Sequence, residues 1–230
     1  MENKSINRIL LENQVLETKR LILRKIKMED ANDMYEYSGD EETVKYVSFK
    51  KHKDLNETYE VLANVFFTNY LRNYAIEIKD TGKMIGTIGL NELDENSAEI
   101  GWIINKKFWG NGYAPESGNR ILKLLFEELN VNQVHAYYDV RNIKSGKALS
   151  KLGMNKWGTI YSYVKAKGED EKIIENKTNS TSNNQNKENN IQNKEDASKQ
   201  KVIGNKKQVV GIDVNYVGIT KEQYFICNID

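Results

Sequence analysis

The sequence is poor in the residues that form disulfide bonds and metal sites. Its 230 residues include one cysteine, Cys227, and two histidines, His52 and His135. A single cysteine excludes a disulfide bond within the chain and fits a reducing compartment. Because the two histidines lie far apart in the sequence and only one cysteine accompanies them, we predict that the protein binds no metal.

Long apolar runs and an excess of one charge are also absent. No apolar run approaches the roughly 20 residues of a membrane span, and residues 1–5 lead into no signal-peptide core. The 34 basic and 33 acidic residues give a formal net charge of +1. This balance offers no electrostatic basis for binding nucleic acid or an anionic membrane. We therefore expect a cytoplasmic protein with neither kind of partner.

One long segment has almost no apolar residues. Residues 167–207 are mainly Asn, Lys, Gln, Glu and Ser. Such a segment buries too little apolar surface to offset its conformational entropy, so we predict a disordered insertion. Alternating apolar residues at 209–217 predict a returning strand, which places the insertion inside a hairpin of one domain. We expect an N-terminal arm at residues 1–15 and a single interrupted domain at residues 16–230.

The spacing of apolar residues predicts alternating strands and helices. Three consecutive strands between residues 74 and 104, joined by short polar turns, predict an antiparallel meander. A helix at 115–129 separates strands at 98–104 and 133–139, which makes those two strands parallel partners. The fold class is therefore α/β, or α+β in stricter usage, with a mixed, mainly antiparallel sheet and helices on both faces. Further strands are predicted at residues 20–26 and 154–165. Further helices are predicted at residues 29–37 and 145–152, and another helix is expected to begin after an N-cap at Asn56.

A glycine turn joins the strand at residues 98–104 to the helix at 115–129. Gly110 and Gly112 let the backbone approach a ligand closely, and Pro115 is tolerated in a first helical turn. The helix N-terminus adds unpaired N–H groups and a partial positive charge, so the turn predicts a cradle for phosphate or pyrophosphate. A dinucleotide fingerprint is excluded because Pro115 replaces its third small residue, and the Gly-Lys-Ser/Thr ending of a P-loop is missing.

The residues around this turn resemble the acetyl-CoA-binding loop of the GNAT acetyltransferase superfamily. The block before the turn is Ala98-Glu99-Ile100-Gly101-Trp102, and the turn itself is Trp109-Gly110-Asn111-Gly112-Tyr113-Ala114. Two further blocks, at residues 16–31 and 142–154, occur in the same order as in that superfamily. The resemblance spans about residues 16–157 and is strongest to the branch that includes the Rim-type ribosomal-protein N-terminal acetyltransferases. Trp109 departs from the Gln or Arg that often opens the loop.

The resemblance implies a GNAT fold in which a splayed strand pair binds acetyl-CoA as co-substrate, with no metal. It implies direct attack of a primary amine on the thioester, most simply a protein N-terminal amine such as that of a ribosomal protein. Polyamines, amino sugars and antibiotics remain open as acceptors, as does a CoA-binding protein without activity. The protein would be a monomer or a homodimer. Early aromatic residues, Tyr46 among them, either border the acceptor site or fill the core.

The resemblance also assigns site residues. Ser145 would protonate the leaving thiolate, because Leu149 stands where another branch has a tyrosine acid. Ser145 also lies near a predicted helix start, where it would equally serve as an N-cap. Glu99 is the first choice for the base, with Asp139 and Glu77 as alternatives. The residues expected to hold the cofactor are Trp102, Ile103, Ile104, Gly110, Asn111, Gly112, Tyr113, Ala114, Asn142 and Ser145.

Overall fold

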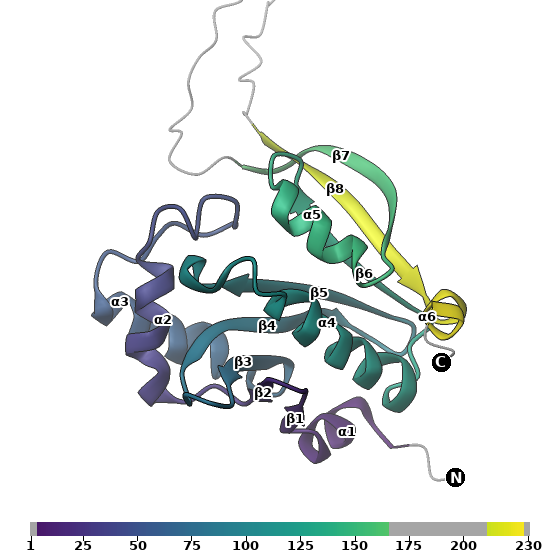
Figure 1. Cartoon of the computed structure of the whole chain (residues 1–230), viewed down its shortest axis with the longest axis horizontal. Helices are drawn as coiled ribbons and strands as arrows, with labels where there is room; N and C mark the ends of the chain where they lie inside the picture. The colour runs from purple at the N-terminus through teal and green to yellow at the C-terminus, as the bar shows by residue number, and fades with distance from the viewer. Residues whose placement is uncertain (1–3, 166–210, 228–230) are drawn as a thin grey trace, which may run out of the picture.

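The computed structural model describes residues 4–165 and 211–227, in which eight strands form one sheet (Figure 1). The order of the strands across the sheet is β1-β2-β3-β4-β5-β6-β8-β7. All neighbours are antiparallel except β5 and β6, which run parallel. The predicted mixed, mainly antiparallel sheet is therefore confirmed. The strands are β1 Val15–Glu17, β2 Leu21–Arg24, β3 Asn73–Ile78, β4 Met84–Leu93, β5 Ser97–Ile104, β6 Gln133–Asp139, β7 Asn155–Lys165 and β8 Gly211–Thr220.

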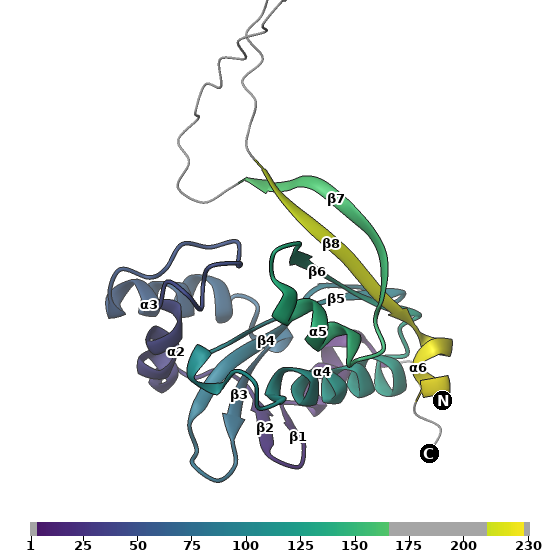
Figure 2. The same ribbon diagram turned by 45° about the horizontal axis from the view of Figure 1, so that its top comes forward.

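Helices cover both faces of the sheet, as predicted (Figures 1 and 2). On β3 the side chains alternate, so that Tyr74 and Ile76 enter one apolar cluster and Ala75 enters the other. The larger cluster contains residues of α1, α4 and α5, and the smaller one contains residues of α2. The helices are α1 Ile6–Glu12, α2 Ala31–Ser38, α3 Leu55–Val61, α4 Tyr113–Lys123, α5 Ile143–Ser150 and α6 Lys221–Cys227.

Helix ends differ from the predictions by a few residues. The N-cap of α3 is Asp54, whose carboxylate accepts the backbone N–H of Glu57 at 2.9 Å, so the prediction of Asn56 as the cap is wrong. Asp and Asn are equally good caps, and the apolar spacing alone does not choose between them. The predicted helix at 115–129 begins at Tyr113 and ends in a π-helical turn, Leu124–Glu128.

Strands β5 and β6 pair only at their beginnings. Ser97, Ala98 and Glu99 face residues 133–135, and no pairing between the two strands follows in the described structure. Beyond that point β5 remains paired with β4, while β6 pairs along its whole length with β8. The two strands therefore separate beside the N-terminus of α4, as the sequence predicts.

The two ends of the segment at residues 166–210 leave from neighbouring strands. Lys165 on β7 pairs with Gly211 on β8. The predicted insertion at residues 167–207 lies outside the described residues. After β8, Thr220 and Gln223 exchange side-chain and backbone hydrogen bonds, which form the capping box of α6. None of the helices in the described residues has the length and apolar character that a membrane span requires.

Candidate active site

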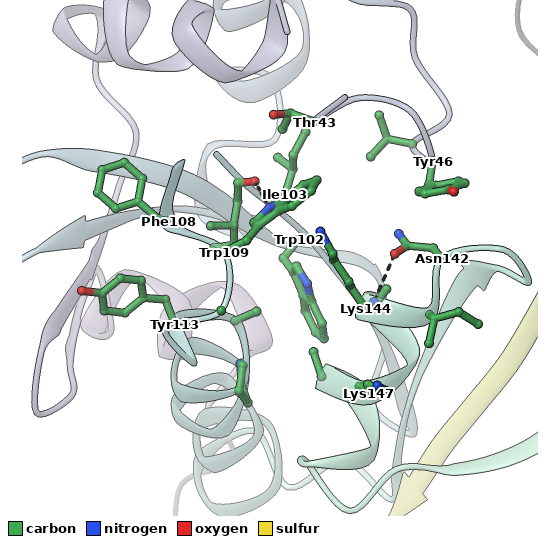
Figure 3. Close-up of a pocket in the computed structure, with 18 of the residues that line it drawn as sticks. Thr43, Tyr46, Trp102, Ile103, Phe108, Trp109, Tyr113, Asn142, Lys144 and Lys147 are labelled. Atoms are coloured by element: carbon green, nitrogen blue, oxygen red, sulfur yellow. Dashed lines mark hydrogen bonds between the residues drawn. The ribbon is translucent and has the colours of Figure 1, made fainter. Parts of the chain in front are cut away.

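A cavity of about 710 Å³ lies where β5 and β6 separate (Figure 3). Pockets of roughly 300–1,000 Å³ are typical of small-molecule and cofactor sites. Its walls come from the end of β5, the glycine turn at residues 109–114, the start of α4, the start of α5 and the loop at residues 42–47. Of the residues predicted to hold the cofactor, those that line this cavity are Trp102, Ile103, Ile104, Gly110, Gly112, Tyr113, Ala114, Asn142 and Ser145.

The glycine turn has the backbone shape that a phosphate cradle requires. Gly110 and Gly112 have φ angles of +84° and +78°, a region that other residues rarely adopt. Gly112 is the N-cap of α4 and has no side chain to occupy the free N–H groups of the first turn. Tyr113 and Ala114 are the first two residues of the helix, and Pro115 follows without an N–H. The positive end of α4 therefore faces the cavity with N–H groups that have no partner in the described part of the chain.

Asn111 is the one predicted cofactor residue that does not line the cavity. Its side-chain Nδ2 donates to the Phe108 carbonyl at 3.1 Å, and its own carbonyl accepts from Arg20 Nη2 at 3.0 Å. Asn111 therefore stabilises the turn through these hydrogen bonds and does not face the cavity.

A cluster of Thr18, Arg20 and Glu116, which the sequence did not reveal, ties the glycine turn to the start of β2. The Glu116 carboxylate accepts from Thr18 Oγ1 at 2.6 Å and from Arg20 Nε at 2.7 Å. The Arg20 guanidinium also lies 4.5 Å from the centre of the Tyr113 ring. Burial acts to raise the pKa of Glu116, but the hydrogen bonds from Thr18 and Arg20 outweigh it and the pKa is lowered. The carboxylate thus stays ionised at the helix N-terminus.

The edge of β5 that faces the gap carries backbone groups for a ligand. The N–H of Asn105 donates to a carbonyl of β4 at 2.8 Å. Because backbone groups alternate between the two edges of a strand, those of Ile103 face β4, whereas those of Trp102 and Ile104 face the gap. The Ile104 carbonyl there accepts the indole N–H of Trp109 at 2.7 Å. Trp102 therefore presents both backbone groups to the cavity, and Ile104 presents its N–H.

The start of α5 supplies Asn142 and Ser145. Asn142 is the N-cap, and its Oδ1 accepts the backbone N–H of Ser145 at 3.1 Å. The alternative role of Ser145 as N-cap is therefore wrong. Within the described part of the chain, the Ser145 hydroxyl makes no hydrogen bond. It is available to a ligand.

Positive charge predominates in the cavity wall. Lys144 Nζ lies 4.2 Å from the centre of the Trp109 ring, and Figure 3 shows these two residues beside Trp102 and Asn142 at the same opening. Among the described lining residues Glu42 is the one acid. This balance suits an anionic ligand. The basic lining residues are Lys45, Arg141, Lys144, Lys147 and Lys151.

A second pocket of about 300 Å³ adjoins the cavity and contains Glu99. The Glu99 carboxylate accepts Asn91 Nδ2 at 2.8 Å. No ion pair to Glu99 occurs among the described residues, so the carboxylate remains open to a cationic ligand. The residues shared by the two pockets are Tyr46, Val47, Trp102, Asn142 and Ser145.

The two alternative bases, Asp139 and Glu77, each accept hydrogen bonds from an arginine side chain. Asp139 lines the second pocket, but its oxygens accept Arg141 Nε at 2.9 Å and Arg141 Nη2 at 2.6 Å. Burial acts to raise the pKa of Asp139, and the hydrogen bonds from Arg141 outweigh it, so that the pKa is lowered. Glu77 accepts Arg24 Nε at 2.5 Å and lines neither pocket. Glu99 is thus the best placed of the three carboxylates.

Residues 20–155 match the family described as acetyltransferase (GNAT) domain. The chain is 32% identical over 160 residues to an uncharacterised N-acetyltransferase, p20, of Bacillus licheniformis, covering 67% of this chain and 90% of that protein. It is 34% identical over 108 residues to a putative ribosomal N-acetyltransferase, YdaF, of Bacillus subtilis, covering 40% and 59%.

Solved structures share the fold. A GNAT-family acetyltransferase from Bacillus anthracis has a TM-score of 0.65 at 20% identity, covering 90% of this chain and 99% of that one. A spermidine N-acetyltransferase from Vibrio cholerae, solved with CoA and spermine, has a TM-score of 0.61 at 18% identity, covering 90% and 99%. The chain therefore belongs to the GNAT family and is an acetyl-CoA-dependent N-acetyltransferase.

Proposed function

We propose that this enzyme acetylates the N-terminal amine of a protein, such as a ribosomal protein, by direct attack of the amine on acetyl-CoA. The observation that carries the proposal is the meeting of two pockets at Trp102 and Ser145, with the open carboxylate of Glu99 in the smaller one. The similarity to the putative ribosomal N-acetyltransferase of Bacillus subtilis supports a ribosomal acceptor.

The larger cavity is proposed to hold acetyl-CoA. The N–H groups of Gly112, Tyr113 and Ala114 would receive the pyrophosphate at the positive end of α4. The gap-facing backbone of Trp102 and Ile104 would receive the amides of the pantetheine arm. The lysines of α5 would neutralise the remaining phosphate charge. This arrangement delivers the thioester to the junction of the two pockets.

Glu99 and Ser145 are proposed to move the two protons of the reaction. Glu99 would take a proton from the ammonium form of the acceptor, directly or through a water molecule. The neutral amine then attacks the thioester carbonyl, a C–N bond forms, the C–S bond breaks and the nitrogen releases its second proton. Ser145 would give its hydroxyl proton to the departing thiolate and regain one from the nitrogen. It is suited to this role because the residue lines both pockets and its hydroxyl has no other partner in the described structure.

A small amine is the second candidate acceptor. The pocket that contains Glu99 encloses only about 300 Å³, and a structurally similar enzyme is a spermidine N-acetyltransferase. A small polyamine would fit such a volume, whereas a protein N-terminus would insert only its first residues.

The test is an acceptor panel in which the acetylated product is identified by mass spectrometry. The panel contains peptides with ribosomal-protein N-termini, the same peptides with a blocked N-terminus and an internal lysine, and small amines including spermidine. We expect acetylation of the free N-terminal peptides alone. Acetylation of spermidine with no peptide product would overturn the proposed acceptor, and acetylation of the blocked peptides would move it to a lysine side chain.

A further inference from the structure

Three potential metal ligands meet on neighbouring strands of the sheet. His135 on β6 lies directly opposite Glu99 on β5 in the parallel pairing. Glu92 lies in the irregular part of β4, where the register with β5 shifts between Leu90 and Leu93. One ligand atom from each of these three side chains lies within 4.8 Å of the other two.

His135 is the most informative member of this cluster. Its side chain is only 7% exposed, yet its Nδ1 is buried without a hydrogen-bond partner in the described structure. Buried polar atoms are nearly always paired, so an unpaired one calls for a ligand or an ion. The rings of Tyr137 and Tyr216 pack edge-on against the imidazole, at centroid distances of 5.7 and 5.5 Å. These two rings restrict the rotation of the imidazole.

Glu99 is also held in place. Asn91 Nδ2 donates to its Oε1 at 2.8 Å, and the second oxygen has no partner among the residues that the structure describes. Hydrogen bonds of this kind orient carboxylate ligands in metal sites. Glu92 is exposed and approaches the other two ligands from β4, whereas His135 approaches from β6 on the other side of β5. An ion therefore has an open path to the cluster.

We propose that Glu92, Glu99 and His135 bind a divalent transition-metal ion of the zinc class. Tetrahedral zinc with bonds of about 2.0–2.2 Å places its ligand atoms roughly 3.3–3.6 Å apart, so side-chain rotations that draw the three ligand atoms together from within 4.8 Å would close the site. One imidazole with two carboxylates suits zinc and its neighbours, whereas magnesium and calcium prefer oxygen ligands alone. The sequence predicts no metal because it offers few histidines and cysteines, and only the strand pairing shows which acids lie beside His135.

Occupation of this site would also affect acetyl transfer. Glu99 is the proposed base, and a carboxylate bound to a metal ion no longer accepts a proton from the acceptor amine. This consequence depends on the proposed function, whereas the metal site itself does not. Zinc should thus inhibit the enzyme through the acceptor pocket and leave acetyl-CoA binding intact.

The binding test uses the full-length protein, freed of metal, and zinc chloride in a non-chelating buffer without acetyl-CoA. Isothermal titration calorimetry compares wild type with Glu92→Gln and with Glu95→Gln, a matched control because Glu95 is exposed near by but outside the cluster. We expect one ion per chain in wild type and in the control. Loss of an outer-shell partner alone typically weakens a metal site about 10–100-fold, so Glu92→Gln should weaken binding at least about tenfold. Equal affinities for wild type and Glu92→Gln, or no saturable binding to wild type, would overturn the site.

A second measurement separates the metal site from the proposed function. The acetylated product is quantified by mass spectrometry as zinc is added, because zinc also binds the CoA thiol and disturbs thiol detection. Each variant is compared with its own metal-free rate. Inhibition that follows the measured affinities, strong in wild type and weak in Glu92→Gln, supports the proposal. Stoichiometric zinc binding without inhibition would leave the site standing and overturn Glu99 as the base.

Discussion

Glu116 shows how a single side chain prepares the cofactor site without entering it. Its carboxylate accepts hydrogen bonds from Thr18 and Arg20. Arg20 also donates to the carbonyl of Asn111, so these contacts together fix the glycine turn. The ion pair is partly exposed, with 43% of the Arg20 side chain and 19% of the Glu116 side chain accessible. Its contribution should therefore be moderate, on the order of 1 kcal/mol.

Glu116→Gln should accordingly weaken acetyl-CoA binding by roughly 3–10-fold, because the turn loses its anchor while the N–H donors remain. The rate at saturating acetyl-CoA should change little. Isothermal titration calorimetry checks the affinity, and Glu12→Gln serves as control because Glu12, at the end of α1, forms ion pairs with Lys4 and Arg8. An affinity loss equal in both variants would show that the anchor has no specific role.

Lys25 is a buried amine that links stability to pH. It is 5% exposed, its Nζ donates to the Leu71 carbonyl at 2.6 Å, and Nζ lies 3.4 Å from the centre of the Tyr74 ring. Burial lowers the pKa of Lys25 from its ordinary 10.5 to about 7. Between these values the unfolded chain binds more protons than the folded one, so the free energy of unfolding rises with pH.

Lys25→Met should remove this dependence. The stability of wild type relative to the variant should increase from pH 7 to pH 9.5 by up to about 1.4 kcal/mol per pH unit. Contact with the Tyr74 ring favours the charged amine, so the slope should fall below that limit. Urea unfolding at several pH values measures it, and a difference that stays constant or shrinks as the pH rises would contradict the account.

At the residue scale, the sequence predicts site residues that belong to a short local motif. It misses residues whose role depends on a contact between distant parts of the chain. Gly110, Gly112 and Ser145 belong to short motifs around helix starts and were predicted. The contact of Arg20 with Glu116 joins residues 96 positions apart, and no local pattern marks such a pair. Asn91, which orients Glu99, was missed because its position in the irregular part of β4 is invisible in the apolar spacing.

At the level of elements, the close contact of β4 with β5 positions the edge that faces the cofactor cavity. A Cβ atom on Gly86 would lie 2.1 Å from the Ile103 carbonyl oxygen and 3.0 Å from the Ile104 Cα. These are backbone atoms, which cannot rotate away. Gly158 on β7 offers the matched case, because a Cβ there would meet nothing within 4 Å.

Gly86→Ala should destabilise the protein by about 1–3 kcal/mol or more and weaken acetyl-CoA binding, because β5 must shift to relieve the contact. Gly158→Ala should change stability by no more than about 0.5 kcal/mol. Thermal unfolding and acetyl-CoA titration of both variants give the comparison. If Gly86→Ala were as stable as Gly158→Ala, the tight packing of these two strands would be refuted.

Most elements were predicted to within a few residues because each carries its own apolar period. The parallel pairing of β5 with β6 was also predicted, since a helix between two strands leaves few other topologies. The ends of the helices were harder to predict from the sequence. Asp54 and Asn56 are both good caps, and the π-helical turn at Leu124–Glu128 has no signal in the apolar spacing.

At the scale of the whole molecule, the segment at residues 166–210 joins two neighbouring strands of the same sheet. That segment connects β7 to β8 at paired positions, Lys165 and Gly211. A short connection would therefore join the same two strand ends.

Replacing residues 172–201 with a short Gly/Ser linker should preserve the fold. The affinity for acetyl-CoA should stay within about twofold of wild type, because none of the residues proposed to hold the cofactor belongs to the replaced segment. Calorimetric titration of the shortened protein is the check. Loss of cooperative unfolding or of acetyl-CoA binding would mean that the segment is required by the domain.

The arrangement of two pockets around one junction is the feature that sequence alone could not supply. The glycine turn predicted an anion site, but the loop at residues 42–47 reaches both pockets from a segment with no recognisable motif. Tyr46 was predicted either to border the acceptor site or to fill the core, and it lines both pockets. Only the structure shows that Tyr46 borders the pockets and does not fill the core.

The central claim is that Glu99 accepts the proton of the acceptor amine at this junction, and the rate of Glu99→Gln tests it most directly. With saturating acetyl-CoA and the acceptor found in the panel, kcat should fall about 100–10,000-fold, the usual range for loss of a general base. The affinity for acetyl-CoA should remain unchanged, and Glu95→Gln should behave as wild type. A kcat for Glu99→Gln equal to that of Glu95→Gln would contradict the account and require another base.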